Sequence, residues 1–358
     1  MTHTPSPHPS PASESVDPTV VAESRWPYPK RILFAAAVAV VLVLLWQLAD
    51  VLVLTFGAIV IAAIVRGLAR RFEGRFGLST HTSGILSALS ILGLLGLAFW
   101  LTGGALTDQI GQLREGIPQA WAAASDWLDD HALGRQFLQL VDEARESGLS
   151  GSGVAGVAGT AFGALGSAVL MIIVGIYFAL DPDLYRKGLL ELIPPDYRPR
   201  SGDALTASGQ ALSRWLLGQS AAMVFLGIST ALGLWLLDIP LALTLGFITA
   251  LFAFVPFFGA MAAGVLSVLM AFTVGPEKAL YVALLFLALQ QVEEYFLQPY
   301  VQRWAVAMPP VLTMLSAVIF GILFGTIGVV FATPMMVIVM VLVRKLYIQG
   351  ALESPPSN

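Results

Sequence analysis

Long apolar runs dominate the pattern of hydrophobic and polar positions along the chain. The runs carry very few charges and cover residues 32–65, 84–106, 154–180, 215–237, 241–274, 279–292 and 309–343. One helical crossing of a hydrocarbon core about 30 Å thick needs roughly 20 such residues. The runs do not alternate between apolar and polar residues, as barrel strands do. They therefore predict an all-α polytopic membrane protein with about seven or eight transmembrane helices.

Three runs are longer than one comfortable crossing. Each holds about 34 residues, and the run 32–65 has Asp50 at its middle, which predicts a tight helical hairpin with Asp50 at the outer turn. The runs 241–274 and 309–343 each contain helix breakers, Pro256 and Gly259 in the first and Gly321, Gly325, Gly328 and Pro334 in the second. Each of these two runs is predicted to be broken or re-entrant, either as one broken helix or as a hairpin.

The distribution of charge predicts the topology, because Lys and Arg concentrate in cytoplasmic loops. Basic residues flank the first run on both sides, and residues 181–214 hold five more, so this segment is expected in the cytoplasm. Residues 107–150 hold three arginines against eight acidic residues and are expected outside. Both termini are then cytoplasmic. The transmembrane domain is predicted to span residues 31–347, between a disordered Pro/Ser-rich tail (1–30) and a polar tail (348–358).

Two segments outside the apolar runs have helical periodicity. Apolar residues recur every three or four positions from Leu106 to Leu128, which predicts an external amphipathic helix. This helix is either a lid or partner-binding arm, or a helix lying on the protein's own outer surface, and the second interpretation is favoured. Residues 184–192 form a second amphipathic stretch on the predicted cytoplasmic side.

Composition excludes several classes of function. Only 12% of the residues are charged, cysteine is absent, and the four histidines stand apart from one another, so no thiol chemistry, cofactor or metal site is expected. The chain has no metalloprotease motif, no serine-histidine-aspartate set and no phosphate loop, so neither an enzyme nor an ATPase is predicted. No long basic stripe is available for nucleic acid. The expected partners are the lipid bilayer and a small solute or ion, and the glycine-rich faces permit a homo-oligomer.

A polar cluster follows the apolar run 279–292. It comprises Gln290, Gln291, Glu293, Glu294, Gln298 and Pro299. On an α-helix Gln290, Glu294 and Gln298 share one face. A charge at the centre of the bilayer costs about 2.5 to 3.5 kcal/mol, so such side chains usually face a cavity or a partner. We therefore predict that Glu293 or Glu294 binds a cation, a proton or a polar substrate in a water-filled path; the alternative is a solvated helix end.

The helix breakers are the second candidate site. Proline removes a backbone donor, and the freed carbonyls need a partner in the protein or water. Transporters use such broken helices to line substrate sites. Pro256 and Gly259 are accordingly predicted to expose carbonyls, and Gly325, Gly328 and Pro334 to permit a hinge or a close approach of helices. A plain structural kink is the alternative in both places.

In this order and spacing, the motifs resemble the autoinducer-2 exporter family of PerM-like permeases. The resemblance spans residues 31–347 and includes the basic stretch after the first run, Asp181-Pro182-Asp183 and Gly321 through Pro334. Its more specific marks are Val255-Pro256-Phe257-Phe258-Gly259 and Gln290-Gln291-Val292-Glu293-Glu294 running into Gln298-Pro299. It implies a bacterial inner-membrane protein with about eight helices. Some members of the family are assigned export of a signalling molecule and others sodium/proton antiport.

The chain departs from the family pattern at two places. Glu293-Glu294-Tyr295 replaces a glutamate, small residue and asparagine, and Met308-Pro309-Pro310 lacks the family's histidine, which excludes a histidine proton relay there. The predicted function is a permease or exporter of a small solute, driven by an ion gradient or facilitated. A sodium or lithium/proton antiporter is the alternative within transport. A membrane scaffold that recruits a partner through residues 107–150 is the alternative outside it.

Overall fold

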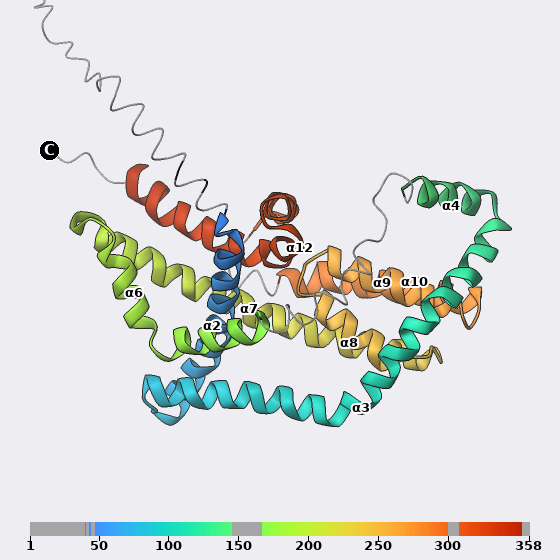
Figure 1. Cartoon of the computed structure of the whole chain (residues 1–358), viewed down its shortest axis with the longest axis horizontal. Helices are drawn as coiled ribbons and strands as arrows, with labels where there is room; N and C mark the ends of the chain where they lie inside the picture. Colours follow the sequence, from blue (N-terminus) through green and yellow to red (C-terminus); the bar gives the residue numbers. More distant parts are fainter. Residues whose placement is uncertain (1–39, 41–42, 44–46, 145–166, 300–307, 353–358) are drawn as a thin grey trace, which may run out of the picture. The chain divides into compact units, whose positions relative to one another are not determined.

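The computed structural model describes residues 40, 43, 47–144, 167–299 and 308–352. The side chains of 94–95, 97–108, 110, 132–133, 137, 310 and 350–352 lie outside the described part. The chain divides into two compact units, residues 1–49 and 50–358, and nearly all described residues belong to the second. Its described residues form helices and no strand (Figure 1), which confirms the all-α prediction. Four described helices are long and apolar enough to cross a membrane, or five if a bent pair counts as one span.

Some predictions fall on residues outside this part. They are the tail 1–30, most of the first half of the predicted hairpin 32–65, the glycine-rich stretch 151–166 and the last residues, 353–358. The predicted polar tail begins at residue 348, but the chain is helical to Leu352 because the π-helix η4 (Val343–Leu352) prolongs the last membrane helix.

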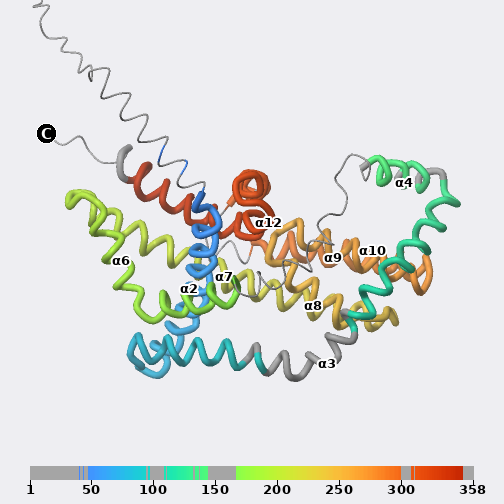
Figure 2. Tube along the Cα trace, viewed as in Figure 1, coloured from blue at the N-terminus to red at the C-terminus, as the bar shows by residue number. Residues whose placement is uncertain are grey.

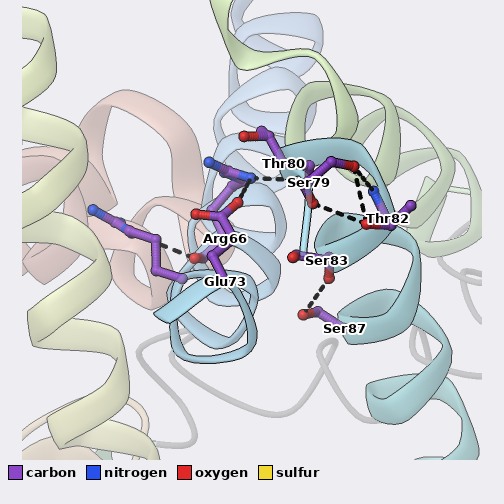
Figure 3. A network of polar contacts seen from close by, with 8 residues as sticks. Arg66, Glu73, Ser79, Thr80, Thr82, Ser83 and Ser87 are labelled. Atoms are coloured by element: carbon purple, nitrogen blue, oxygen red, sulfur yellow. Dashed lines mark hydrogen bonds and ion pairs between the residues drawn. The ribbon is translucent and has the colours of Figure 1, made fainter. Parts of the chain in front are cut away.

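The basic stretch after the first run is helical rather than a loop. Helix α2 spans Ala49–Phe76 and carries Arg66 through Arg75 on its last turns. Arg66 donates to Glu73 at 3.1 Å and to the carbonyl of Thr80 at 3.4 Å, so the end of α2 is held to the start of α3 (Figure 3). Gly77, with φ 62°, makes the turn between them, and Ser79 accepts a hydrogen bond from the Thr82 amide as the N-cap of α3.

The predicted external helix is continuous with the crossing before it. Helix α3 spans Thr80–Asp129, and α4 follows at Ala132–Ala144. Leu113 and Ala120 of α3 are buried in a core cluster with Leu245 and Met270, and the Thr244 hydroxyl donates to the Gln109 side chain. The described part of the predicted amphipathic stretch therefore packs on the protein's own helices, in agreement with the favoured interpretation.

The predicted cytoplasmic segment 181–214 is also divided among helices. The helix Ser167–Leu180 turns by 87° at Asp181 into α6 (Pro182–Glu191). The short 3-10 helix η2 (Pro195–Tyr197) leads into α7, Arg198–Leu236. Residues 198–214 are thus the first half of the long helix α7, and their predicted cytoplasmic location stays a prediction. At 39 residues α7 is about 58 Å long, which exceeds the thickness of a hydrocarbon core.

The run 241–274 is a helical hairpin, which settles one of the two alternatives left open by the sequence. Helix α8 spans Ala242–Phe252 and α9 spans Phe258–Ala271. Leu245, at the start of α8, and Met270, at the end of α9, share one core cluster, so the two helices fold back on each other (Figure 2). Eleven residues of α8 extend only about 17 Å, too short to cross a bilayer. The hairpin is therefore re-entrant.

The last described elements carry the polar cluster and the second broken run. Helix α10 (Pro276–Val292) continues into the π-helical turn η3 (Glu293–Leu297). Helix α12 (Pro310–Leu342) follows residues 300–307, which lie outside the described part. Met308 joins a second core cluster with side chains of α2, α7 and α12.

Candidate functional site

The tip of the α8–α9 hairpin is a strained turn. The amide of Phe258 donates to the carbonyl of Pro256 at 2.8 Å, two residues back, which closes a γ-turn. Its central residue, Phe257, has φ 66° and ψ −56°, in a region that costs a non-glycine residue of order 1–3 kcal/mol. Such strain concentrates at functional sites. The sequence predicted the break at Pro256 but not the strained Phe257.

Gly259 is required by a close approach within the hairpin. A Cβ at this position would overlap the carbonyl oxygen of Phe252, the last residue of α8. The Gly259 amide donates to the Val255 carbonyl at 2.9 Å, so the turn is closed by a backbone hydrogen bond as well. The chain therefore breaks at Pro256 and Gly259 between α8 and α9. The carbonyls of Ala253, Val255 and Pro256 accept hydrogen bonds within the protein, so their predicted exposure to a solute stays a prediction.

Helix α7 holds this tip in place. The Gln219 side chain is 2% exposed and donates to the carbonyl of Ala253 at 2.6 Å. One turn earlier, Trp215 contacts Phe254 edge to face, with ring centroids 6.0 Å apart. Gln219 satisfies one of the carbonyls that the end of α8 leaves without a helical partner. Gln219 was not predicted from the sequence, although a lone glutamine inside the apolar run 215–237 was a usable signal.

The second break is a sharp kink at Gly325. Its φ of 66° and ψ of −152° interrupt α12, and only glycine adopts this conformation at low cost. A Cβ at Gly328 would overlap the carbonyl oxygen of Phe320, so the two parts of α12 touch beside the kink. A kinked close approach is thus present at Gly325 and Gly328, and their role as a hinge stays a prediction. Pro334 does not break the helix: it is fully buried and α12 stays helical through it, because neighbouring groups in membrane proteins can satisfy the freed carbonyl.

The two broken segments meet at one cavity of about 980 Å³. The hairpin contributes Val255 and Gly259, the kinked part of α12 contributes Gly321 and Gly325, and α7 contributes Met223. Among the described lining residues Thr326 is the only one with a polar side chain. The cavity can therefore accommodate an apolar or amphipathic group, with Thr326 and the backbone of the breaks supplying the hydrogen bonds. Pro256, Gly328 and Pro334 are not among its described lining residues.

The polar cluster after α10 is rearranged by the π-helical turn. The Gln298 amide donates to the carbonyl of Glu293, five residues back, and the Gln298 side chain is a hydrogen-bond partner of the Glu293 carboxyl group. The α-helical spacing predicted that Gln290, Glu294 and Gln298 share one face, and this prediction is wrong. The π-turn contains one extra residue, so Gln298 lies above Glu293 and not above Glu294. π-turns inside helices occur frequently at functional sites.

The two glutamates of the cluster have opposite environments. Glu293 is 4% exposed, and among the described residues its Oε2 atom has no hydrogen-bond partner. Glu294, like Gln291 and Pro299, is exposed, while Gln290 and Gln298 are half-buried. A buried carboxyl oxygen without a partner is costly and points to a ligand such as a proton, a cation or water. Neither glutamate is among the described lining residues of the cavity at the breaks, so the structure keeps the two predicted sites separate.

Comparisons with known proteins agree with this architecture. The family model described as AI-2E family transporter matches residues 34–348. The chain belongs to the AI-2E family of transporters. Two relatives, YrrI of Bacillus subtilis and MT0215 of Mycobacterium tuberculosis, each carry the name "Putative transport protein". Both are 26% identical to this chain; the alignments cover 71% of this chain and 77% of YrrI, and 89% of both this chain and MT0215.

Membership of the AI-2E family confirms the resemblance that the motifs indicated. It places the chain in the membrane and supports a membrane permease rather than an enzyme.

Proposed function

We propose that this AI-2E family protein is a secondary permease that exports a small solute across the bacterial plasma membrane, with both termini in the cytoplasm. The observation that carries the proposal is the convergence of two broken membrane segments, at Gly259 and Gly325, on one cavity. Broken helices that meet at a cavity are the arrangement by which transporters bind solutes and alternate access. No phosphate loop occurs in the sequence, so transport draws on a gradient or is facilitated.

The cavity favours a solute with an apolar portion. Its described lining is aliphatic and aromatic apart from Thr326, and a strongly polar solute would lose more hydrogen bonds to water than this lining can replace. We assign the coupling ion to Glu293, whose buried Oε2 atom has no partner in the part of the chain that the structure describes, with Gln298 orienting the carboxyl group. Glu294 and Gln291 are exposed and would contact the ion or solute only on its way in or out.

A monovalent cation/proton antiporter is the second candidate. The buried, incompletely paired Glu293 favours it, because a carboxyl group that exchanges a proton for a cation needs such a position. The scaffold alternative is less supported, since the described part of residues 107–128 packs through Leu113 and Ala120 on the protein's own core instead of offering a free arm.

Efflux from proteoliposomes against a panel of solutes of graded polarity tests the proposal. The variant Ala262→Trp places an indole in the cavity and should reduce efflux, whereas Val265→Trp, at a position of the same helix that is not among the described lining residues, should leave efflux unchanged. Equal efflux in wild type and Ala262→Trp would reject the cavity as the solute site.

The coupling role is tested with Glu293→Gln and the matched variant Glu294→Gln. Glu293→Gln should retain solute binding, but its efflux should no longer depend on the ion gradient. In Glu294→Gln efflux should still depend on the gradient. If sodium or lithium dissipates a proton gradient in everted vesicles and no solute is exported, the antiporter is the correct candidate. Unchanged coupling in Glu293→Gln would remove this residue from either mechanism.

A further inference from the structure

Helix α6 presents an apolar face that nothing in the described structure covers. No residue of α6 is buried, and the exposed fractions of Leu184, Leu189 and Leu192 are 65%, 49% and 82%. On a helix of this length Leu184, Gly188 and Leu192 form one stripe, and Tyr185 and Leu189 lie beside it. An uncovered apolar stripe of this kind marks an interaction surface.

The opposite side of α6 is already attached to α7. Arg198 donates to the carbonyls of Ile193 at 2.9 Å and Glu191 at 3.2 Å, which caps the end of α6. Leu190 lies against Gly202, where an added Cβ would be 3.4 Å from its Cδ1 atom. Since Leu190 faces α7, the stripe of Leu184 and Leu192 is turned away from the helix that holds α6.

The bend of the chain at Asp181 indicates how α6 is oriented relative to the helix before it. The apolar helix Ser167–Leu180 is exposed at Val169, Leu170 and Ile173, as a helix in contact with lipid is. The chain then turns by 87° into α6. A helix at right angles to a membrane span lies along the membrane surface, at the level where the span ends. Tyr185 packs edge to face on Phe178 at 4.6 Å, so the turn is fixed by contacts on both sides of Asp181.

We propose that α6 is an interfacial helix whose apolar stripe inserts into the lipid leaflet on the side where the helix Ser167–Leu180 ends. Amphipathic helices of this kind bury their apolar face about 5–10 Å into the boundary between headgroups and acyl chains. Residues 181–200 contain four acidic and four basic residues, so insertion depends on apolar area and not on attraction to anionic lipid. Through Arg198 and Gly202 this helix sets the depth of α7 in the bilayer, and α7 in turn holds the hairpin tip through Gln219.

Single cysteines test the insertion directly, because the chain contains no cysteine. The full-length variants Leu184→Cys, Leu189→Cys and Leu192→Cys are spin-labelled in proteoliposomes, with Asp183→Cys and Lys187→Cys on the polar side of α6 as matched controls. The leucine positions should collide several-fold more with oxygen, which concentrates in lipid, than with a water-soluble nickel reagent. The controls should show the reverse. Thermal unfolding of each labelled protein verifies that it is folded.

Three outcomes would overturn the proposal. Leucine positions as accessible to nickel as the controls would place the stripe in water. Protection from both reagents would mean that protein covers the stripe, either a second copy of the chain or another partner. Protection of the leucine positions from nickel that appears only when phosphatidylglycerol is added to phosphatidylcholine vesicles would mean that headgroup charge, not apolar insertion, holds the helix. None of these readouts depends on transport, so they stand apart from the test of the permease.

Discussion

The side-chain amide of Gln219 donates a hydrogen bond of 2.6 Å to the backbone carbonyl of Ala253. It joins the middle of α7 to the tip of the re-entrant hairpin, at a point where both residues are buried. The hairpin tip that this bond holds forms one wall of the candidate solute cavity. A break in a membrane helix is stable only if the carbonyls it frees find partners, and here one partner comes from a different helix.

Replacing Gln219 by leucine should destabilise the hairpin tip. The Ala253 carbonyl would remain buried without its partner, at a cost of about 1–3 kcal/mol. We expect a lower thermal midpoint of the protein in nanodiscs and reduced efflux from proteoliposomes. The exposed glutamine of α4, as Gln136→Leu, is the control and should change neither quantity. An unaltered midpoint in Gln219→Leu would show that the tip is held by packing alone.

Gly259→Ala should be among the most damaging single-methyl additions in this protein. The new Cβ would overlap the carbonyl oxygen of Phe252, and relief requires the backbone of the tip to move, with a penalty of about 3 kcal/mol or more. Gly74→Ala in α2 is the matched control, since nothing in the described part of the chain lies within 4 Å of its Cβ position and alanine favours a helix by roughly 0.5–1 kcal/mol. Chemical denaturation of both variants should therefore shift in opposite directions.

Gly325→Ala separates backbone strain from steric overlap. No atom of the described residues lies within 4 Å of a Cβ at this position, so the cost comes from the φ of 66° and ψ of −152° and should be about 1–3 kcal/mol. The variant should relax the kink, which distance measurements between spin labels at Val318 and Val339 would report as a longer separation. Gly188→Ala, also free of neighbours, controls for the added methyl group. An unchanged label distance would show that surrounding helices, and not Gly325, impose the kink.

Lys278→Met should loosen the turn between α7 and α8. The Lys278 ammonium group donates to the Leu237 carbonyl at 2.7 Å and lies 3.6 Å from the Asp238 carboxylate. The hydrogen bond from a charged donor is worth about 1.5–3 kcal/mol, whereas the ion pair to an exposed carboxylate is worth about 1 kcal/mol or less. Asp238→Asn should therefore be mild and Lys278→Met severe in thermal unfolding. Equal losses in the two variants would mean that the ion pair dominates.

Several features of the fold followed from local sequence. Apolar runs of sufficient length gave helices, and the breakers Pro256, Gly259 and Gly325 stand where helices end, begin or kink. These predictions succeeded because backbone hydrogen bonding in lipid and the conformational limits of proline and glycine act over a few residues. The helix does not break at Pro334. Whether a proline breaks a helix depends on which neighbouring groups bind the carbonyl that it frees in the preceding turn, and the sequence does not show those neighbours.

The candidate site was less predictable. The spacing of Gln290, Glu294 and Gln298 assumed an ordinary α-helix, and the π-turn shifted Gln298 toward Glu293. Nothing in the sequence distinguishes the buried Glu293 from the exposed Glu294, because adjacent residues on a helix differ in burial according to what packs beside them. Gln219 was overlooked because its partner, Ala253, is a backbone group in another helix.

The sequence by itself determined that this chain is a helical membrane protein of the AI-2E type, with two interrupted segments and an acidic cluster. Only the tertiary structure decided that 241–274 folds back as a hairpin, that its tip and the Gly325 kink share one cavity, and that Glu293 is the glutamate withdrawn from solvent. The reason is physical. Hydrophobicity and backbone conformation are properties of neighbouring residues, whereas a cavity and a buried charge arise from contacts between helices far apart in the chain.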